Sequence, residues 1–264
     1  MRAILTLLGL MAAAAYSLAA RADAGFAALV SPPRFEIKGK PGATVREVFE
    51  LSNRSAAPAK FRVHTADFTL SPDYSVVFHD ELVPGSCRPW VAIERPLVTL
   101  PGGGTIRYRF EVAVPADAPS GECRFGILIE GDEASVTQAQ SLVLPVVGRI
   151  GIIVYVKVGD GAPKIEVFGP QVASLNGIQV PALRVHNSGN AHARLSGFLT
   201  GTDASGRKYD VTPSDLPILP GEERTVYLTP STPEQEHPQA SFPMTVKGTL
   251  EWGDQSTELN ELFK

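Results

Sequence analysis

Residues 106–113 read IRYRFEVA, and every second side chain in this stretch is apolar: Ile106, Tyr108, Phe110 and Val112. A period of two places these side chains on one face of a β-strand, toward a core, and leaves the other face in water. The same period recurs at residues 60–65 and 123–130. Turn-forming stretches separate these runs, and no helical stripe follows residue 24. The sequence therefore predicts an all-β fold.

The strand pattern occurs twice along the chain. About seven strands between residues 27 and 157 have the short, regular spacing of an immunoglobulin-like sandwich. The pattern pauses at residues 159–163, which read GDGAP, and strand candidates then resume at 180–185, 195–199, 224–228 and 244–252. Both halves show a strand, an Asn turn, a strand, a Pro-Gly turn and a further strand. We expect two immunoglobulin-like β-sandwich domains, residues 25–158 and 163–264, joined by a short linker.

Residues 1–24 differ in composition from the rest of the chain. Arg2 provides a positive start, residues 4–20 are apolar, and the small-residue segment Ala22-Asp23-Ala24 follows. These are the parts of a secretory signal peptide that is cleaved after Ala24. An N-terminal anchor helix is the alternative, because the apolar stretch reaches the lower limit for a membrane span. The signal-peptide interpretation predicts an exported, soluble protein.

Composition and motifs exclude several classes of function. The formal net charge of −4 argues against a nucleic-acid partner, because phosphate binding needs a clustered surplus of Lys and Arg. The chain has no Gly-x-Ser-x-Gly, no His-Glu-x-x-His and no phosphate-binding Gly-Lys-Ser/Thr loop. His186 and His192 flank a turn but lack a third metal ligand nearby. We expect no enzyme activity, no small-molecule substrate, no cofactor and no bound metal.

The chain contains two cysteines, Cys87 and Cys123, both in the first expected domain. In an oxidising compartment such a pair forms a disulfide. The alternatives are a catalytic thiol or a metal pair, and each lacks a nearby His in the sequence. We therefore expect a structural disulfide between Cys87 and Cys123.

As a strand, residues 142–156 would be apolar on both faces, apart from Arg149 and Gly151. As one strand they would extend about 50 Å, well beyond the usual length. Pro145 cannot donate a ladder hydrogen bond, which favours a sheet edge. A long apolar edge normally templates pairing with another chain. Two interpretations remain: a last strand that switches sheets and is covered by the second domain, or an edge that pairs with a partner by β-augmentation.

Several short motifs resemble those of the periplasmic pilus-assembly chaperones. Residues 29–35 read LVSPPRF, residues 49–53 read FELSN, and a Pro-Gly turn at 101–102 precedes an alternating strand. The resemblance also covers the signal peptide, the two sandwiches and the long last strand of the first one. It implies that Arg34 binds the terminal carboxylate of a fibre subunit, and that the strand donates the apolar residues Leu142, Leu144 and Val146.

The sequence differs from the family at the second cation that binds the subunit's terminal carboxylate. Gly151 stands where the family has a lysine, and Arg149, two residues earlier on the same face, is the expected substitute. The resemblance implies a divergent periplasmic chaperone that caps pilus or other surface-fibre subunits by donor-strand complementation, with an outer-membrane usher as a further expected partner. The alternative is an immunoglobulin-like adhesion or scaffold protein of the cell surface that binds an envelope partner.

Overall fold

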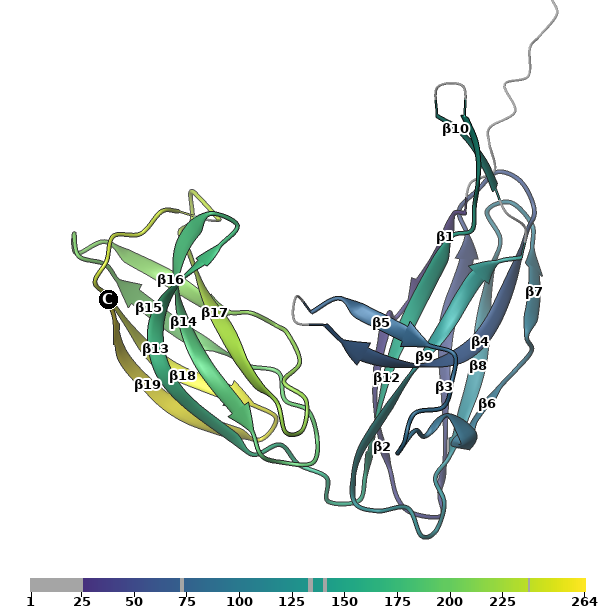
Figure 1. Ribbon diagram of the computed structural model, residues 1–264, viewed down its shortest axis with the longest axis horizontal. Coiled ribbons are helices and arrows are strands. Elements are labelled where there is room, and N and C mark those ends of the chain that lie inside the picture. The colour runs from purple at the N-terminus through teal and green to yellow at the C-terminus, as the bar shows by residue number, and fades with distance from the viewer. Residues whose placement is uncertain (1–25, 72–73, 133–134, 140–141, 237) are drawn as a thin grey trace, which may run out of the picture.

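The computed structural model describes residues 26–71, 74–132, 135–139, 142–236 and 238–264, with backbone alone for 135–139 and 142–146. The predicted signal peptide therefore lies outside the described residues. The chain forms two lobes side by side (Figure 1). Strands make up nearly all the regular structure, and the described part contains no helix that is long and apolar enough to cross a membrane.

The first lobe is a sandwich of two sheets. One has the strand order β1-β3-β8-β6 and the other β2-β12-β9-β4-β5, with β7 added on β4. A short 3₁₀ turn, η1 (Arg88–Trp90), precedes β6. The strands are β1 (Ala28–Ser31), β2 (Arg34–Gly39), β3 (Thr44–Asn53), β4 (Ala59–Leu70), β5 (Val76–His79), β6 (Val91–Ile93), β7 (Leu97–Leu100), β8 (Thr105–Ala113), β9 (Gly121–Gly131), β10 (Ser135–Ala139), β11 (Leu142–Val146) and β12 (Arg149–Val158).

The alternation that predicted strand β8 also sets its packing. Tyr108, Phe110 and Val112 are buried, whereas Arg107 and Arg109 are exposed. The buried faces of the two sheets meet in one aromatic-rich core, in which Phe110 makes edge contacts with Phe35 and Phe125. The Cys87–Cys123 disulfide joins the segment before η1 to β9, with the two Cα atoms 5.9 Å apart.

The second lobe is built around a single strand path, β13-β14-β17-β16-β15-β18-β19, that encloses its own core. The strands are β13 (Ile165–Leu175), β14 (Ile178–Asn187), β15 (Ser196–Thr202), β16 (Lys208–Pro213), β17 (Glu223–Ser231), β18 (Met244–Trp252) and β19 (Gln255–Phe263). The predicted fold class, all-β with two immunoglobulin-like sandwiches, is confirmed.

The two lobes repeat one buried turn. In the first, the Asn53 side-chain amide donates to the carbonyls of Ala57 and Pro101. In the second, the Asn187 amide donates to the carbonyls of Ala191 and Ile218. Each amide therefore ties its own turn to the chain at the Pro-Gly turn or just before it. The faint echo in the sequence corresponds to this shared arrangement.

The expectation of one strand over residues 142–156 is wrong. The chain leaves the ladder at Val147 and Gly148, so β11 and β12 are separate strands. The ring of Phe26 lies where a Cβ on Gly148 would be, 2.1 Å from its nearest ring atom. β11 instead pairs with β10 in a hairpin that projects from the first lobe (Figure 1). β12 is an interior strand along most of its length, because Ile153–Val158 also pairs with β2.

Candidate functional site

The first lobe has an open strand edge at the start of β12. β12 pairs with β9 along its whole length, from Arg149 opposite Glu130 to Val158 opposite Gly121. Its pairing with β2 begins only at Ile153. Residues 149–152 therefore have no partner on that side among the described strands. β11, which precedes them, pairs with β10 alone in the described chain. Free backbone groups along such an edge can accept a further strand.

Apolar side chains lie where the open edge passes from β11 to β12. Val147, between these two strands, is 56% exposed. Phe26 packs on Gly148 and makes an edge contact with Phe61. The side chains of Leu142, Leu144 and Val146 lie outside the described residues, so their donation to a partner stays a prediction.

Arg34 lies where β2 begins, opposite Ile153, and its side chain is 41% exposed. Its Nε is 3.2 Å from the Glu36 carboxylate, and its Nη1 is 3.9 Å from Asp215 of the second lobe. Arg34 thus stands at the junction of the lobes between two exposed carboxylates. Because both pairs are exposed to water, each contributes little stability and can be exchanged.

Arg149 lies on the same face of the sheet but at a different level. It forms an ion pair with Glu130, its cross-strand partner in β9. Four register positions separate Arg149 from Ile153, the partner of Arg34, which corresponds to roughly 13 Å along the strand. The structure therefore does not bring Arg34 and Arg149 together at one point, and the substitution of Arg149 for the family's lysine stays a prediction.

Gly151 lies under an aromatic ring. A Cβ at Gly151 would be 2.3 Å from the ring of Phe78, and one at Gly126 would be 2.5 Å from it. The ring is carried by a two-stranded ribbon, made of residues 67–70 of β4 and the whole of β5, which we call the β4–β5 ribbon. Phe78 therefore occupies the space above Gly151 that a longer side chain would need.

The β4–β5 ribbon also reaches the second lobe (Figure 1). The Tyr74 hydroxyl, at the end of the ribbon, donates to the Thr225 carbonyl at 2.9 Å. The Arg224 guanidinium lies 4.4 Å from the centre of the Tyr74 ring, and Glu222 holds that guanidinium through two hydrogen bonds. Lower on the ribbon, Phe68 packs with Tyr155 and with Leu219 of the second lobe. The ribbon is therefore an interdomain contact that lies far from the linker in sequence.

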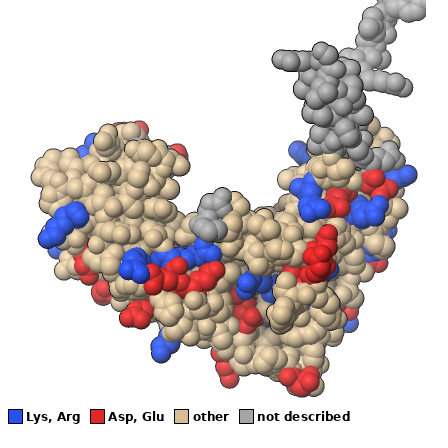
Figure 2. Space-filling model, viewed as in Figure 1, with Lys and Arg blue, Asp and Glu red and all other residues tan. Residues whose placement is uncertain are grey.

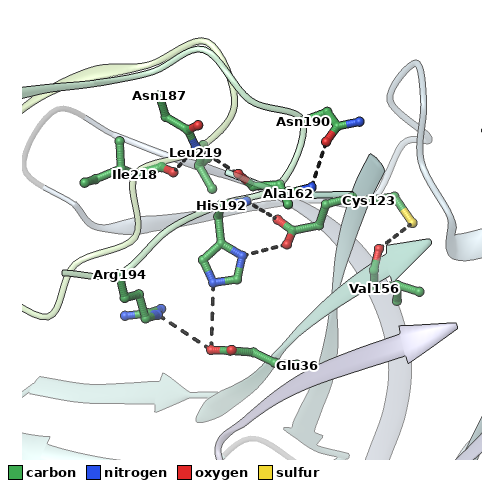
Figure 3. A network of polar contacts seen from close by, with 12 residues as sticks. Glu36, Cys123, Val156, Ala162, Asn187, Asn190, His192, Arg194, Ile218 and Leu219 are labelled. Atoms are coloured by element: carbon green, nitrogen blue, oxygen red, sulfur yellow. Dashed lines mark hydrogen bonds and ion pairs between the residues drawn. The ribbon is translucent and has the colours of Figure 1, made fainter. Parts of the chain in front are cut away.

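A partly buried polar cluster forms another interdomain contact (Figure 3). His192 of the second lobe directs Nδ1 at Glu122 of β9, 2.7 Å away, and its Nε2 is 3.8 Å from Glu36 of β2. The ring stacks on Tyr155 at 4.0 Å between centroids. Arg194 adds an ion pair to Glu36 at 3.8 Å. The cluster lines a cavity of about 320 Å³ between the lobes.

These contacts shift two pKa values in a consistent way. Burial lowers the pKa of His192, but the contacts with Glu122 and Glu36 outweigh it, so the pKa lies above its usual value. The contact with His192 in turn lowers the pKa of Glu36, against the opposing effect of burial. Both shifts favour a charged imidazolium beside a charged Glu36 carboxylate.

The sequence alone offers only one role for His192, as a metal ligand beside His186, and that pair lacks a third ligand nearby. Within the described residues, no group of three or more His, Cys, Asp or Glu side chains is placed to hold a metal ion. The partners of His192 lie 70 and 156 positions away, so no local pattern could reveal them.

The space-filling view shows a concave face between the lobes, with charged side chains of both signs around it (Figure 2).

No family model matches the chain, and no curated protein matches it well enough to count as a relative. Among solved structures it is similar to the class 5 fimbriae chaperone CfaA, with 13% identity over 90% of this chain and 99% of that one, and a TM-score of 0.48. The E. coli chaperone DraB is 16% identical over 90% and 97% of the two chains, with a TM-score of 0.45.

A third similar structure is the CsuC–CsuE chaperone–tip adhesion subunit pre-assembly complex from the archaic chaperone-usher Csu pili of Acinetobacter baumannii. It is 13% identical over 90% of this chain and 99% of the matched chain, with a TM-score of 0.45. At these identities and TM-scores, the structural similarity does not indicate what this protein binds.

Proposed function

We propose that the protein is a periplasmic, non-enzymatic chaperone that binds surface-fibre subunits by strand addition at the edge formed by β11 and residues 149–152. The observation that supports this proposal most strongly is the open edge itself, with the exposed Val147 between β11 and β12. An exposed apolar edge is normally avoided in a soluble protein, because it templates pairing with other chains. A subunit that supplies a strand would satisfy the free backbone groups and cover the apolar side chains.

Strand addition and carboxylate binding have different roles in this proposal. Backbone pairing and burial of Leu142, Leu144 and Val146 supply affinity, at about 25 cal/mol per Å² of apolar surface before ordering costs are subtracted. Arg34 supplies alignment, because a guanidinium can bind a terminal carboxylate through two parallel hydrogen bonds. Its present partners, Glu36 and Asp215, are exposed and can be displaced.

The cellular setting of the proposal follows from the sequence and the disulfide. The signal peptide at residues 1–24 is expected to deliver the chain to the periplasm, and the Cys87–Cys123 bond suits an oxidising compartment. Pilus or other surface-fibre subunits are the proposed partners, with an outer-membrane usher as a second candidate.

The test is co-purification of tagged protein from the periplasm, with identification of bound proteins by mass spectrometry. A Leu142→Glu/Leu144→Glu variant should fold, export and lose its exported β-rich subunit. Phe198→Glu is the control, because Phe198 is 88% exposed on β15 of the second lobe. It should retain the subunit.

Undiminished binding by a folded double variant would reject strand donation through this face. If the double variant does not fold, Val147→Glu replaces it, since Val147 is exposed beside the same edge. A folded wild-type protein that retains no exported subunit would favour the adhesion or scaffold alternative.

A further inference from the structure

The His192 side chain contacts two strands of the other lobe. It belongs to the second lobe, yet its imidazole is held between Glu122 on β9 and Glu36 on β2 of the first lobe (Figure 3). Only 7% of its side-chain surface is exposed, and the Glu122 side chain is 4% exposed.

The two ring nitrogens make unequal contacts. Glu122 holds His192 twice, since one carboxylate oxygen accepts from Nδ1 at 2.7 Å and the other accepts from the backbone N–H at 3.2 Å. Nε2 is 3.8 Å from Glu36, a longer and more exposed contact. When a histidine loses one of its two protons, the other nitrogen keeps its hydrogen. The short bond to Glu122 retains the proton on Nδ1, so Nε2 is the nitrogen that deprotonates.

We propose that His192 is a proton-dependent clamp between the lobes, which contacts both Glu122 of β9 and Glu36 of β2 when doubly protonated and loses its own contact with Glu36 when Nε2 loses its proton. The neutral ring still binds Glu122, so the lobes stay attached at β9. Glu36 keeps Arg194 and Arg34, at 3.8 Å and 3.2 Å, as its remaining cations. The clamp therefore changes the tightness of the junction without separating the lobes.

Other ionisable groups surround the contact between His192 and Glu36. Tyr155 stacks on the ring and stays neutral, because burial raises the pKa of its phenol. The other charged groups that line the cavity around His192 are Lys38 on β2, Lys157 on β12, Arg194 on the segment of His192, and Asp254 between β18 and β19. Of these, only Asp254 is anionic, and no ion pair joins it to His192 in the described chain.

The direction of the pH effect follows from the two pKa shifts. Because the pKa of His192 is raised in the folded protein, the clamp's contribution is complete below about pH 6.5, the value for an unfolded histidine. It is lost as pH rises through the folded pKa. The lowered pKa of Glu36 keeps that carboxylate charged on the acidic side until pH falls below its usual range.

If the proposed function holds, the clamp also acts on Arg34. A charged His192 partly neutralises the negative charge of the Glu36 carboxylate. Glu36 then binds Arg34 less strongly, which frees the Arg34 guanidinium for a partner's carboxylate. In the deprotonated state Glu36 retains Arg34 more strongly. This part of the inference rests on the proposed function, whereas the clamp itself does not.

The test uses the free full-length protein, without any partner. Histidine NMR signals followed against pH should show His192 titrating above the usual midpoint, and Glu36→Gln should shift that midpoint downward. Spin labels on the two lobes should report an interdomain distance distribution that broadens as pH rises through the same midpoint. His192→Gln should abolish this response, and His186→Gln, which changes a histidine on β14, should preserve it.

An unchanged His192 midpoint in Glu36→Gln, or an interdomain distribution that does not change across the His192 titration, would overturn the clamp. If His192→Gln does not fold, Glu36→Gln decides alone, because Glu36 is half-exposed and its replacement leaves no buried gap. Loss of the clamp would leave strand addition untouched, and a failure of partner binding would leave the clamp untouched.

Discussion

Gly151 is small because the Phe78 ring occupies the space above it. The resemblance to pilus-assembly chaperones places a lysine at this position, and the sequence alone offers no reason for its absence. The reason is tertiary, since Phe78 lies 73 positions earlier and reaches Gly151 only after the β4–β5 ribbon folds across the sheet. A local pattern of apolar and polar residues cannot contain this information.

We predict that Gly151→Ala destabilises the first lobe by about 1–3 kcal/mol, the usual cost of an added methyl group in a filled space. In a Phe78→Ala background the same change should cost much less, because the ring is gone. Urea unfolding of the four proteins in this cycle measures the coupling. Equal costs in both backgrounds would show that the ring does not fill the site.

Arg34 and Arg149 offer a second residue-scale test, because both are exposed enough to be replaced without unfolding the protein. We expect Arg34→Ala to lose the fibre subunit in co-purification while the melting temperature stays nearly constant. Arg149→Ala should have the same effect if Arg149 replaces the missing lysine. Retention of the subunit by both variants would contradict the carboxylate anchor.

Strands whose two faces differ were predictable from the sequence. In β8 the apolar parity is buried and the charged parity exposed, as the alternation indicates. In β9 the prediction is incomplete, because Gly126 and Leu128 are buried as well as Phe125 and Ile127. Burial of the second parity, like the break at Gly148, depends on segments distant in sequence. Alternation can indicate which face enters the core but not what covers the other face.

The β4–β5 ribbon should restrain the angle between the lobes through Tyr74. We predict that Tyr74→Ala broadens the interdomain distance distribution, measured by spin labels, and leaves unfolding of the first lobe almost unchanged. Tyr74→Phe keeps the ring beneath Arg224 and loses only the bond to Thr225, so it should fall between wild type and Tyr74→Ala. Wild-type behaviour of Tyr74→Ala would mean that the ribbon does not restrain the angle.

At the scale of the whole molecule, the sequence predicted two sandwiches but could not predict how they face each other. The Asn53 and Asn187 turns repeat locally and are visible as an echo in the sequence. The interdomain contacts do not repeat. They join Tyr74 to Thr225 and Glu122 to His192, pairs separated by 151 and 70 positions. These contacts depend on how the two lobes pack against each other, which local sequence patterns do not encode.

The disulfide should contribute to the stability of the whole first lobe. Cys87 and Cys123 close a loop of 36 positions, which corresponds to about 3–4 kcal/mol in the chain-entropy model. We therefore expect reduction, or a Cys87→Ser/Cys123→Ser change, to lower the melting temperature. Non-reducing peptide mapping of exported protein should recover the linked pair. Free thiols in that material would contradict both the bond and the expected compartment.

The central claim is that the open edge formed by β11 and residues 149–152 receives a strand from an exported subunit. Its most direct test is a photoreactive amino acid at position 144, activated in intact cells, with the cross-linked segment identified by mass spectrometry. The same probe at position 198, exposed on the second lobe, is the control. The account predicts that position 144 cross-links to one extended segment of a β-rich fibre subunit and that position 198 does not. No adduct at position 144, or the same adducts at both positions, would contradict it.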